Sequence, residues 1–120
     1  MLVRKRIFLA GPYSDNNIIG ILANIRQGIE VAGLLMAKGY SVFCPFLDAQ
    51  ISLTQFGALL SEQDYKENSL AWVEVADAVL CLSGWELSKG TLAERGIAEQ
   101  NNIPIFISVE SLEEWANNGL

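Results

Sequence analysis

Four short segments of this chain are almost entirely apolar and do not alternate between apolar and polar residues. A strand with one face in water alternates, whereas a strand covered on both faces does not. Longer segments with helical spacing separate the four runs, and this order is typical of a parallel sheet with helices on both faces. The predicted strands are residues 6–10, 40–44, 78–82 and 103–107.

The segments between the predicted strands carry helix signals. Asp15-Asn16-Asn17 offers N-cap side chains for a long helix. Its apolar residues recur every three or four positions over residues 18–36, until Gly39 ends it. Residues 46–62 are apolar but interrupted by glycine, which indicates a loop with a short helix. Further helices are predicted at about 61–75, 89–100 and 111–117, the last one capped by Ser111.

The length of 120 residues suits one domain. We therefore predict a single-domain α/β fold over residues 1–120, a Rossmann-like or flavodoxin-like three-layer sandwich with four to five parallel strands. No apolar run reaches the roughly 20 residues that span a bilayer. The basic start of the chain leads into a short apolar stretch that breaks at Gly11-Pro12, so we expect a cytoplasmic protein without a signal peptide.

The composition excludes several kinds of chemistry. The chain has no histidine, which excludes Ser-His and Cys-His nucleophile schemes and leaves carboxylates, Tyr and Lys for acid–base work. Cys44 and Cys81 are too few for a zinc site, so we expect buried reduced thiols, no metal and no cofactor. The net charge of −6 disfavours polymeric nucleic acid. It does not disfavour a small phosphate held by backbone N–H groups.

Two polar segments follow strand ends at the edge where parallel α/β sheets bind ligands. One is Gly11-Pro12-Tyr13-Ser14, after the first predicted strand, and the other runs over residues 83–94, after the third. Neither contains the glycine-rich dinucleotide or P-loop motif. In the second segment, Ser88 and Gly90 stand at a predicted helix N-terminus, which favours a phosphate. Glu94 lies one to two turns further along and could face the same cleft.

Each of these residues also has a purely structural interpretation. Thr91-x-x-Glu94 fits a capping box, in which Glu94 only caps a helix that starts at Thr91. Ser88 fits an ordinary helix cap. Gly11-Pro12 fits a turn, Tyr13 fits a rim aromatic, and Trp85 fits a packing residue.

Three stretches of the chain together resemble the nucleoside 2-deoxyribosyltransferase superfamily. They are Ile7-Phe8-Leu9-Ala10-Gly11-Pro12-Tyr13, Asn24-Ile25, and the run over residues 76–94 that contains Gly84-Trp85-Glu86-x-Ser88-x-Gly90-x-x-x-Glu94. The resemblance covers nearly the whole chain. It is strongest to the small DUF4406-type branch, which is similar to the 2′-deoxynucleoside 5′-phosphate N-hydrolases.

The resemblance implies a mechanism and a set of site residues. In the superfamily, a glutamate at the position of Glu94 attacks the anomeric carbon of the (deoxy)ribose, displaces the base and forms a glycosyl-enzyme ester, which water or a second base resolves. A serine at the position of Ser88 marks the members that hold a 5′-phosphate. We predict Glu94 and Tyr13 as catalytic residues. The predicted substrate-binding residues are Gly11, Pro12, Ser14, Asn24, Trp85, Ser88 and Gly90.

The expected activity is N-glycosidic cleavage of a (deoxy)nucleoside 5′-monophosphate. A nucleoside 2-deoxyribosyltransferase and a non-catalytic nucleotide-binding or sensing module are the alternatives. The superfamily usually carries an aspartate near the position of Ser69, which orients the nucleophile and helps protonate the base. Asp64 and Glu67 are the candidates to replace it, whereas Asp77 opens the third strand at the opposite edge.

The resemblance also implies an oligomer. Superfamily members are dimers or larger, with a neighbour's C-terminal region closing the site. Residues 115–118 offer Trp115 and two amides for that role, although Trp115 could instead pack on its own sheet. A small apolar domain gains from burying a helix face in a partner, so we expect a homodimer.

Overall fold

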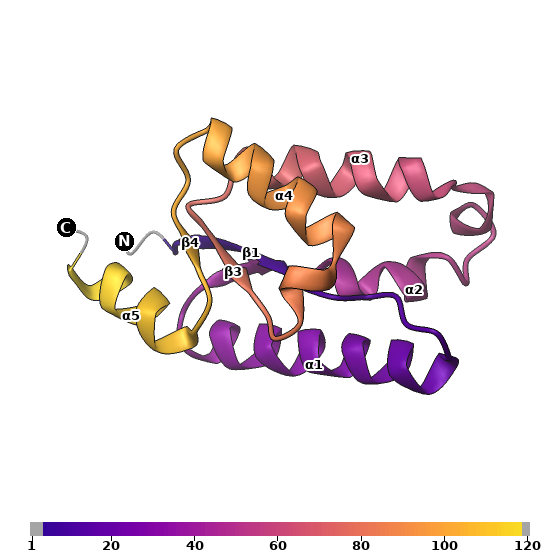
Figure 1. Ribbon diagram of the computed structural model, residues 1–120, viewed down its shortest axis with the longest axis horizontal. Coiled ribbons are helices and arrows are strands. Elements are labelled where there is room, and N and C mark those ends of the chain that lie inside the picture. Colours follow the sequence, from indigo (N-terminus) through magenta and orange to yellow (C-terminus); the bar gives the residue numbers. More distant parts are fainter. Residues whose placement is uncertain (1–3, 119–120) are drawn as a thin grey trace.

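Four parallel strands form the centre of the fold in a computed structural model, of which we describe residues 4–118 (Figure 1). Their order across the sheet is β2-β1-β3-β4, and every neighbouring pair is parallel. The predicted parallel α/β sheet is therefore confirmed, with four strands. The strands are β1 (Arg6–Ala10), β2 (Ser41–Phe43), β3 (Ala78–Cys81) and β4 (Ile105–Phe106).

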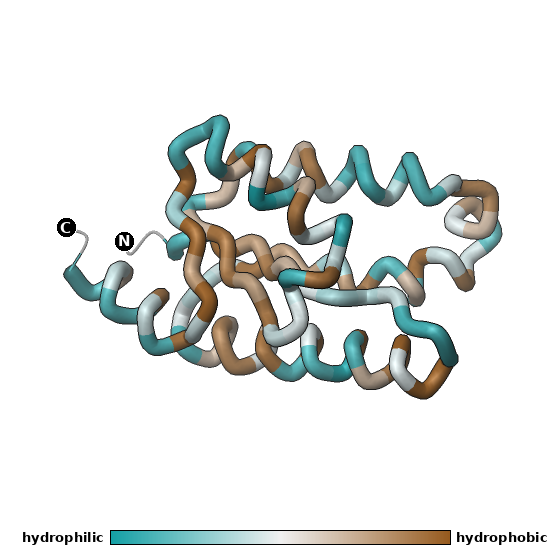
Figure 2. The backbone as a smooth tube through the Cα atoms, viewed as in Figure 1, coloured by the Kyte–Doolittle hydropathy of each residue, from teal (hydrophilic) through white to brown (hydrophobic). Residues whose placement is uncertain are grey.

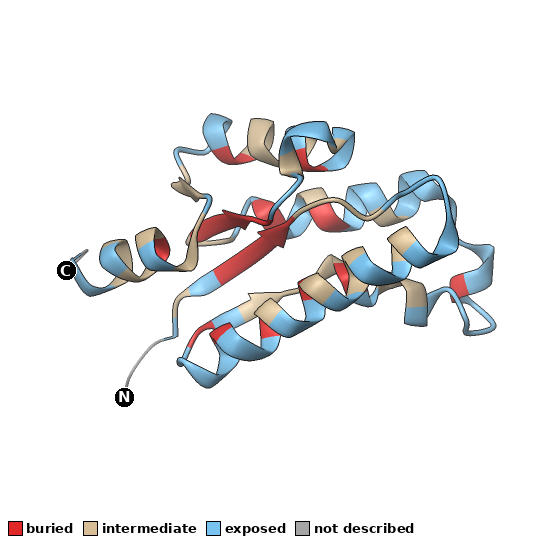
Figure 3. Ribbon diagram, turned by 60° about the horizontal axis from the view of Figure 1, so that its bottom comes forward, coloured by how far each residue is buried: buried red, intermediate tan, exposed pale blue. Residues whose placement is uncertain are grey.

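Both faces of the two central strands are buried, which explains why their sequences do not alternate (Figure 3). Ile7 and Leu9 of β1 point to one face, in a core cluster that contains Leu35 and Leu112. Neighbouring residues of the same strands point to the other face. This second cluster comprises Phe8, Ala10, Val73, Val79, Cys81 and Ala98.

The helices form the two outer layers of a three-layer sandwich, as the strand pattern predicts. Figure 1 shows α1 and α3 on opposite sides of the sheet. The first core cluster joins the sheet to α1 and α5, and the second joins it to α3 and α4. The helices are α1 (Ile18–Ala37), α2 (Asp48–Ile51), α3 (Glu62–Val73), α4 (Lys89–Gln100) and α5 (Val109–Asn118).

Capping residues set the ends of most helices where the sequence places them. Asn17 accepts a hydrogen bond from the Gly20 N–H at the start of α1, and Gly39, at φ 101°, follows its end. Ser61 and Asp64 form a reciprocal capping box on α3. The predicted last helix is confirmed as α5, but its predicted cap is wrong, because Ser108 accepts from the N–H of Ser111 and α5 begins before Ser111.

Between β2 and α3 the chain makes three short helical turns instead of one regular element. They are the 3₁₀ turn Pro45–Leu47, the helix α2, and the 3₁₀ turn Gly57–Leu59. This agrees with the predicted loop and short helix. Phe46 is buried against α1 and fastens the first turn to the core.

Helix α1 carries more apolar residues than the sheet buries. By length and composition it could cross a bilayer, contrary to expectation, yet it packs along the sheet through buried Gly28, Ala32 and Leu35. Much of its predicted apolar stripe stays exposed, including Ile18 at 63% and Leu22 at 57%. Figure 2 shows these hydrophobic segments along the helix.

Candidate active site

A cavity of about 870 Å³ opens at the carboxyl edge of the sheet. The strand order reverses between β1 and β3, because α1 leaves β1 toward one face and α4 follows β3 on the other. Such a switch point leaves a crevice between the two outgoing loops. The lining comes from residues 11–15, from Asn24, and from some of the residues in each of the segments 45–52, 62–70 and 84–94.

Eight of the nine residues predicted for the site line this cavity. The structure brings together Gly11, Pro12, Tyr13, Ser14, Asn24, Ser88, Gly90 and Glu94. Trp85 is the exception, because it lies outside the lining and packs against the α3–α4 side of the core. The guanidinium of Arg95 covers its ring, 4.1 Å from the ring centroid. This placement matches a packing residue.

Glu94 lies in the second turn of α4, inside the helix and not at its cap. The helix begins at Lys89, and its N-cap is Ser88, whose side chain accepts from the Thr91 N–H. The capping-box interpretation of Glu94 is therefore wrong, whereas the helix-cap interpretation of Ser88 is confirmed. Burial, and after it the negative charge of Asp48, raises the pKa of the Glu94 carboxyl to about 8. No ion pair within residues 4–118 involves Glu94.

The N-terminus of α4 presents unused hydrogen-bond donors to the same cavity. The Ser88 hydroxyl accepts from Thr91 at 3.2 Å, which leaves its own proton free to donate. Thr91 is 1% exposed, and its Oγ1 has no hydrogen-bond partner among the described residues. Gly90, two residues after Ser88, has no side chain that would keep a ligand away from the helix N-terminus. With the positive end of the helix dipole, these groups form a site that suits an anion.

The two loops at the switch point hold each other in place. A Cβ on Gly11 would lie 2.9 Å from the Cβ of Leu82, and a Cβ on Gly84 would lie 3.1 Å from the Pro12 ring. Gly84 also adopts φ 89°, a conformation that favours glycine. The two loops therefore pack closely at the cavity mouth, where neither glycine position has free room for a side chain.

Asn24 and Tyr13 connect α1 to the cavity. The Asn24 Nδ2 donates to the carbonyl oxygens of Tyr13, at 3.3 Å, and of Ser14, at 3.5 Å. Asn24 therefore positions the loop that carries Tyr13, and its amide N–H is occupied in that task. Burial, and then the charges of Asp48 and Tyr65, raises the pKa of the Tyr13 hydroxyl.

Sequence reasoning missed a second carboxylate in the cavity, Asp48. It opens α2 just after β2 and is partly buried. Burial raises the pKa of its carboxyl. The rule that found the other two loops applies here too, since β2 also ends at the carboxyl edge of the sheet. Proline and apolar residues around Asp48 concealed this signal.

The acids that the sequence proposed near Ser69 lie elsewhere. Asp64 is exposed and occupied in the α3 capping box, where hydrogen bonds from the Ser61 backbone and side chain lower its pKa. Glu67 is exposed and does not line the cavity. Asp77 accepts from the Arg6 N–H at the amino end of the sheet, which confirms that it is remote. Ser69 itself is buried in the cavity wall.

Comparison with known families matches residues 5–107 to DUF4406, a domain of unknown function. This chain belongs to the DUF4406 family. No curated protein matches the chain. The family match spans all four strands of the DUF4406 domain and every residue that lines the cavity.

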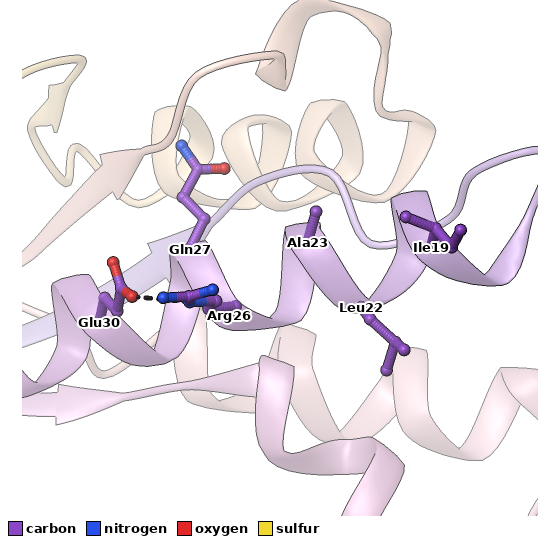
Figure 4. A pocket seen from close by; sticks show the side chains of 6 residues that line it. All are labelled: Ile19, Leu22, Ala23, Arg26, Gln27 and Glu30. Atoms are coloured by element: carbon purple, nitrogen blue, oxygen red, sulfur yellow. Dashed lines mark hydrogen bonds and ion pairs between the residues drawn. The ribbon is translucent and has the colours of Figure 1, made fainter.

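The DUF4406 domain has a second, shallower hollow of about 430 Å³ on α1 (Figure 4). All six of its lining residues come from that one helix, whose surface alone does not enclose a ligand. Figure 4 shows Arg26 joined to Glu30 along the helix, with Leu22 on one side and Gln27 on the other. This hollow brings no second element near the ion pair and carries no chemistry.

The cavity offers no set of ligands for a resident metal. Across residues 4–118, no group of three or more His, Cys, Asp or Glu side chains is arranged to hold an ion. Both cysteines are free thiols: Cys81 is buried and Cys44 partly buried. Burial raises the pKa of the Cys81 thiol to about 11, so it stays protonated at neutral pH.

Proposed function

We propose that this protein is an N-glycosidase that cleaves the base–sugar bond of a (deoxy)nucleoside 5′-monophosphate. One observation carries the proposal: α4 presents an N-terminus with free hydrogen-bond donors and a partly buried carboxyl group to the same cavity. An anchor and a nucleophile on one rigid helix hold the substrate in a fixed register.

The phosphate of the substrate would bind at the start of α4. The free proton of Ser88 and the unpartnered hydroxyl of Thr91 would both donate to phosphate oxygens. Lys89 and Lys66 line the same cavity and bring positive charge. A phosphate so placed gains the helix dipole as well, which favours a nucleotide over a nucleoside.

The sugar would then lie over Glu94. Six residues of α-helix rise about 9 Å from Ser88 to Glu94, and a helical side chain leans back toward the N-terminus of its helix. The Glu94 carboxylate would attack the anomeric carbon, and the base would depart as the C–N bond breaks. Water would then hydrolyse the glycosyl ester and restore Glu94. The resemblance to the nucleoside 2-deoxyribosyltransferase superfamily supports this order of events.

The test is a panel of deoxyribo- and ribonucleoside 5′-monophosphates scored for free base by chromatography. The wild-type protein is expected to release base from at least one member. Glu94→Gln is expected to bind the same nucleotide without releasing base, while Glu99→Gln, an exposed carboxylate on the same helix, keeps the activity. Base release by Glu94→Gln at the wild-type rate would exclude Glu94 as the nucleophile.

Buried Ser69 favours a second candidate, a non-catalytic nucleotide-binding or sensing module, because the superfamily carries an acid near that position. Such a module would gain thermal stability from nucleotides by mass action and never release base. A deoxyribosyltransferase would instead be accelerated by an added acceptor base. The hydroxyl of Ser88 suits a 5′-phosphate better than a free 5′-hydroxyl, which argues against transfer.

We also propose a homodimer that acts in the cytoplasm on a small-molecule nucleotide and not on polymeric nucleic acid. The exposed apolar residues of α1, among them Ile19 and Leu22, are the surface that a second copy would cover. Trp115 packs on Phe106, with ring centroids 5.4 Å apart, and is not in the cavity of its own chain. Any contribution of residues 115–118 to a neighbour's site stays a prediction.

A further inference from the structure

The proposed cleavage lacks an acid at the position where the superfamily carries one. Protonation of the departing base lowers the barrier to its release. Ser69 occupies the expected position, and a serine hydroxyl does not give up a proton near neutral pH. Asp64 and Glu67, the nearby alternatives, do not line the cavity. The acid must therefore come from another element of the wall.

Four carboxylates line the cavity: Asp15, Asp48, Glu62 and Glu94. Asp15 is exposed and accepts from the Asn17 N–H at 3.2 Å, at the start of α1. Glu62 is exposed in the first turn of α3. Asp48 alone shares with Glu94 a partly buried position in the wall. Solvent therefore screens the charges of Asp48 and Glu94 less than those of Asp15 and Glu62.

The sheet topology places Asp48 across the cavity from Glu94. β2 and β3 flank β1 on its two sides, so the segments that follow them border the cavity from opposite directions. Phe46, two residues before Asp48, is 2% exposed and packs over Gly28 of α1. This anchor fixes the turn from which the Asp48 carboxyl enters the wall.

We propose that Asp48 is the second catalytic carboxyl group, which protonates the departing base and then activates the water that frees the sugar. The inference rests on the proposed function of the site. It assigns the role of the missing acid to a residue of the β2–α3 segment, not to α3.

The proposed step balances in protons and electrons. A Glu94 carboxylate oxygen bonds to the anomeric carbon as the carbon–nitrogen bond breaks, and the bonding pair leaves with the base. The Asp48 proton passes to the base, which departs neutral. Asp48, now ionised, takes a proton from water as that water attacks the anomeric carbon. The ester bond breaks, Glu94 leaves as a carboxylate, and Asp48 is again protonated.

The electrostatics of the pair suit this exchange. Burial raises the pKa of both carboxyl groups, and the charge of Asp48 raises that of Glu94 further. Two such groups hold one proton between them near neutral pH. In the ligand-free protein that proton lies on Glu94, whose pKa is about 8, and the proposed reaction starts from the form of the pair in which the proton has passed to Asp48 and Glu94 is ionised. Cys44 also senses the Asp48 charge, and the other titratable side chains in the wall are Tyr13, Asp15, Glu62, Tyr65, Lys66 and Lys89.

The test compares two leaving groups. One substrate is the best 2′-deoxynucleoside 5′-monophosphate of the panel, and the other is 4-nitrophenyl 2-deoxyriboside 5-phosphate, whose nitrophenolate leaves without protonation. Asp48→Asn is expected to lose about 100- to 10,000-fold on the nucleotide and less than about tenfold on the nitrophenyl substrate. Glu94→Gln loses both activities. Glu67→Gln, the matched exposed carboxylate, keeps both.

Two further readouts separate an acid from a structural role. The wild-type rate on the nucleotide is expected to peak where the pair holds one proton, whereas Asp48→Asn loses the falling limb at high pH. Asp48→Glu, which restores a carboxyl group, recovers part of the nucleotide rate. It serves as the test if Asp48→Asn does not fold.

The outcomes distinguish this inference from the proposed function. Equal losses on both substrates, or a wild-type rate of Asp48→Asn on the nucleotide, would overturn the role of Asp48. Base release by the wild-type protein would still support the proposed glycosidase activity in that case. Failure of the wild-type protein to cleave either substrate overturns both.

Discussion

The ring of Phe46 occupies the space in which a side chain on Gly28 would stand. A Cβ built on Gly28 would lie 2.2 Å from the ring of Phe46, which is too close for any real contact. The glycine therefore lets the turn after β2 approach α1, and this approach sets the position of Asp48. A glycine inside a helix costs helix stability, and here it leaves room for the residue that anchors the turn beside the cavity wall.

Gly28→Ala should therefore displace Phe46 and destabilise the protein by about 1–3 kcal/mol, as urea denaturation would measure. The matched control is Gly33→Ala on the same helix, where a Cβ meets nothing within 4 Å. That change should stabilise the protein by about 0.5–1 kcal/mol. Equal effects of the two substitutions would contradict the proposed fit between Phe46 and Gly28.

Glu94→Gln should make the protein more stable at high pH. The folded pKa of Glu94, about 8, lies above its ordinary value of 4.5. Between these values the native state holds a proton that the unfolded chain has lost, so wild-type stability falls as pH rises through this window. Each pKa unit corresponds to about 1.4 kcal/mol. Because the cavity is open to solvent, we expect a gain of about 1–3 kcal/mol in the variant at pH 9.

Denaturation of both proteins at pH 4 and pH 9 measures this difference. At pH 4 Glu94 is protonated in the folded and mostly in the unfolded state, so the two proteins should be nearly equally stable. A variant less stable than the wild type at pH 9 would show that the Glu94 carboxylate is stabilised by its surroundings, contrary to its burial.

Thr91→Val should separate phosphate recognition from folding. The buried Thr91 hydroxyl has no partner among residues 4–118, so its removal should stabilise the ligand-free protein by about 1 kcal/mol. The affinity for a nucleoside monophosphate should fall about five- to tenfold, the equivalent of one hydrogen bond. Calorimetric titration with the matched nucleoside is the control. An equal loss for nucleoside and nucleotide would place the Thr91 contact away from the phosphate.

Leu22→Glu should dissociate the proposed homodimer, because Leu22 is 57% exposed on the apolar face of α1. Sedimentation equilibrium should give a dimer for the wild type and a monomer for the variant. Leu53→Glu, at a site that is 86% exposed and outside α1, should remain dimeric. A monomeric wild-type protein would contradict the proposed homodimer.

The regular elements could be predicted because local signals and the core agree. β1 has the predicted limits, residues 6–10, since residues 7–10 are buried and all apolar, and only Arg6 at the start of the strand is exposed. The caps at Asn17 and Ser61 are local hydrogen bonds that a few neighbouring residues determine. At α5 the predicted cap, Ser111, is wrong, because its backbone N–H donates to the side chain of Ser108 three residues earlier.

The cavity could be predicted only in part. The loops after β1 and β3 were found because strand order brings them together, and eight predicted residues meet there. Asp48 was missed because residues 45–59 form short turns without periodicity, and the position of Asp48 depends on a tertiary contact between Phe46 and Gly28. Trp85 was placed in the site by its motif, whereas in the structure its ring packs under Arg95, in the second turn of α4.

The most direct test of the central claim is the covalent state of Glu94 during turnover. Acid quenching of the wild-type protein with a deoxynucleoside 5′-monophosphate, followed by peptide mass spectrometry, should show a deoxyribose phosphate ester on the peptide that contains Glu94. The ester should be absent in Glu94→Gln and should disappear as substrate is consumed. Release of base with no ester on that peptide, at any quench time, would contradict the mechanism.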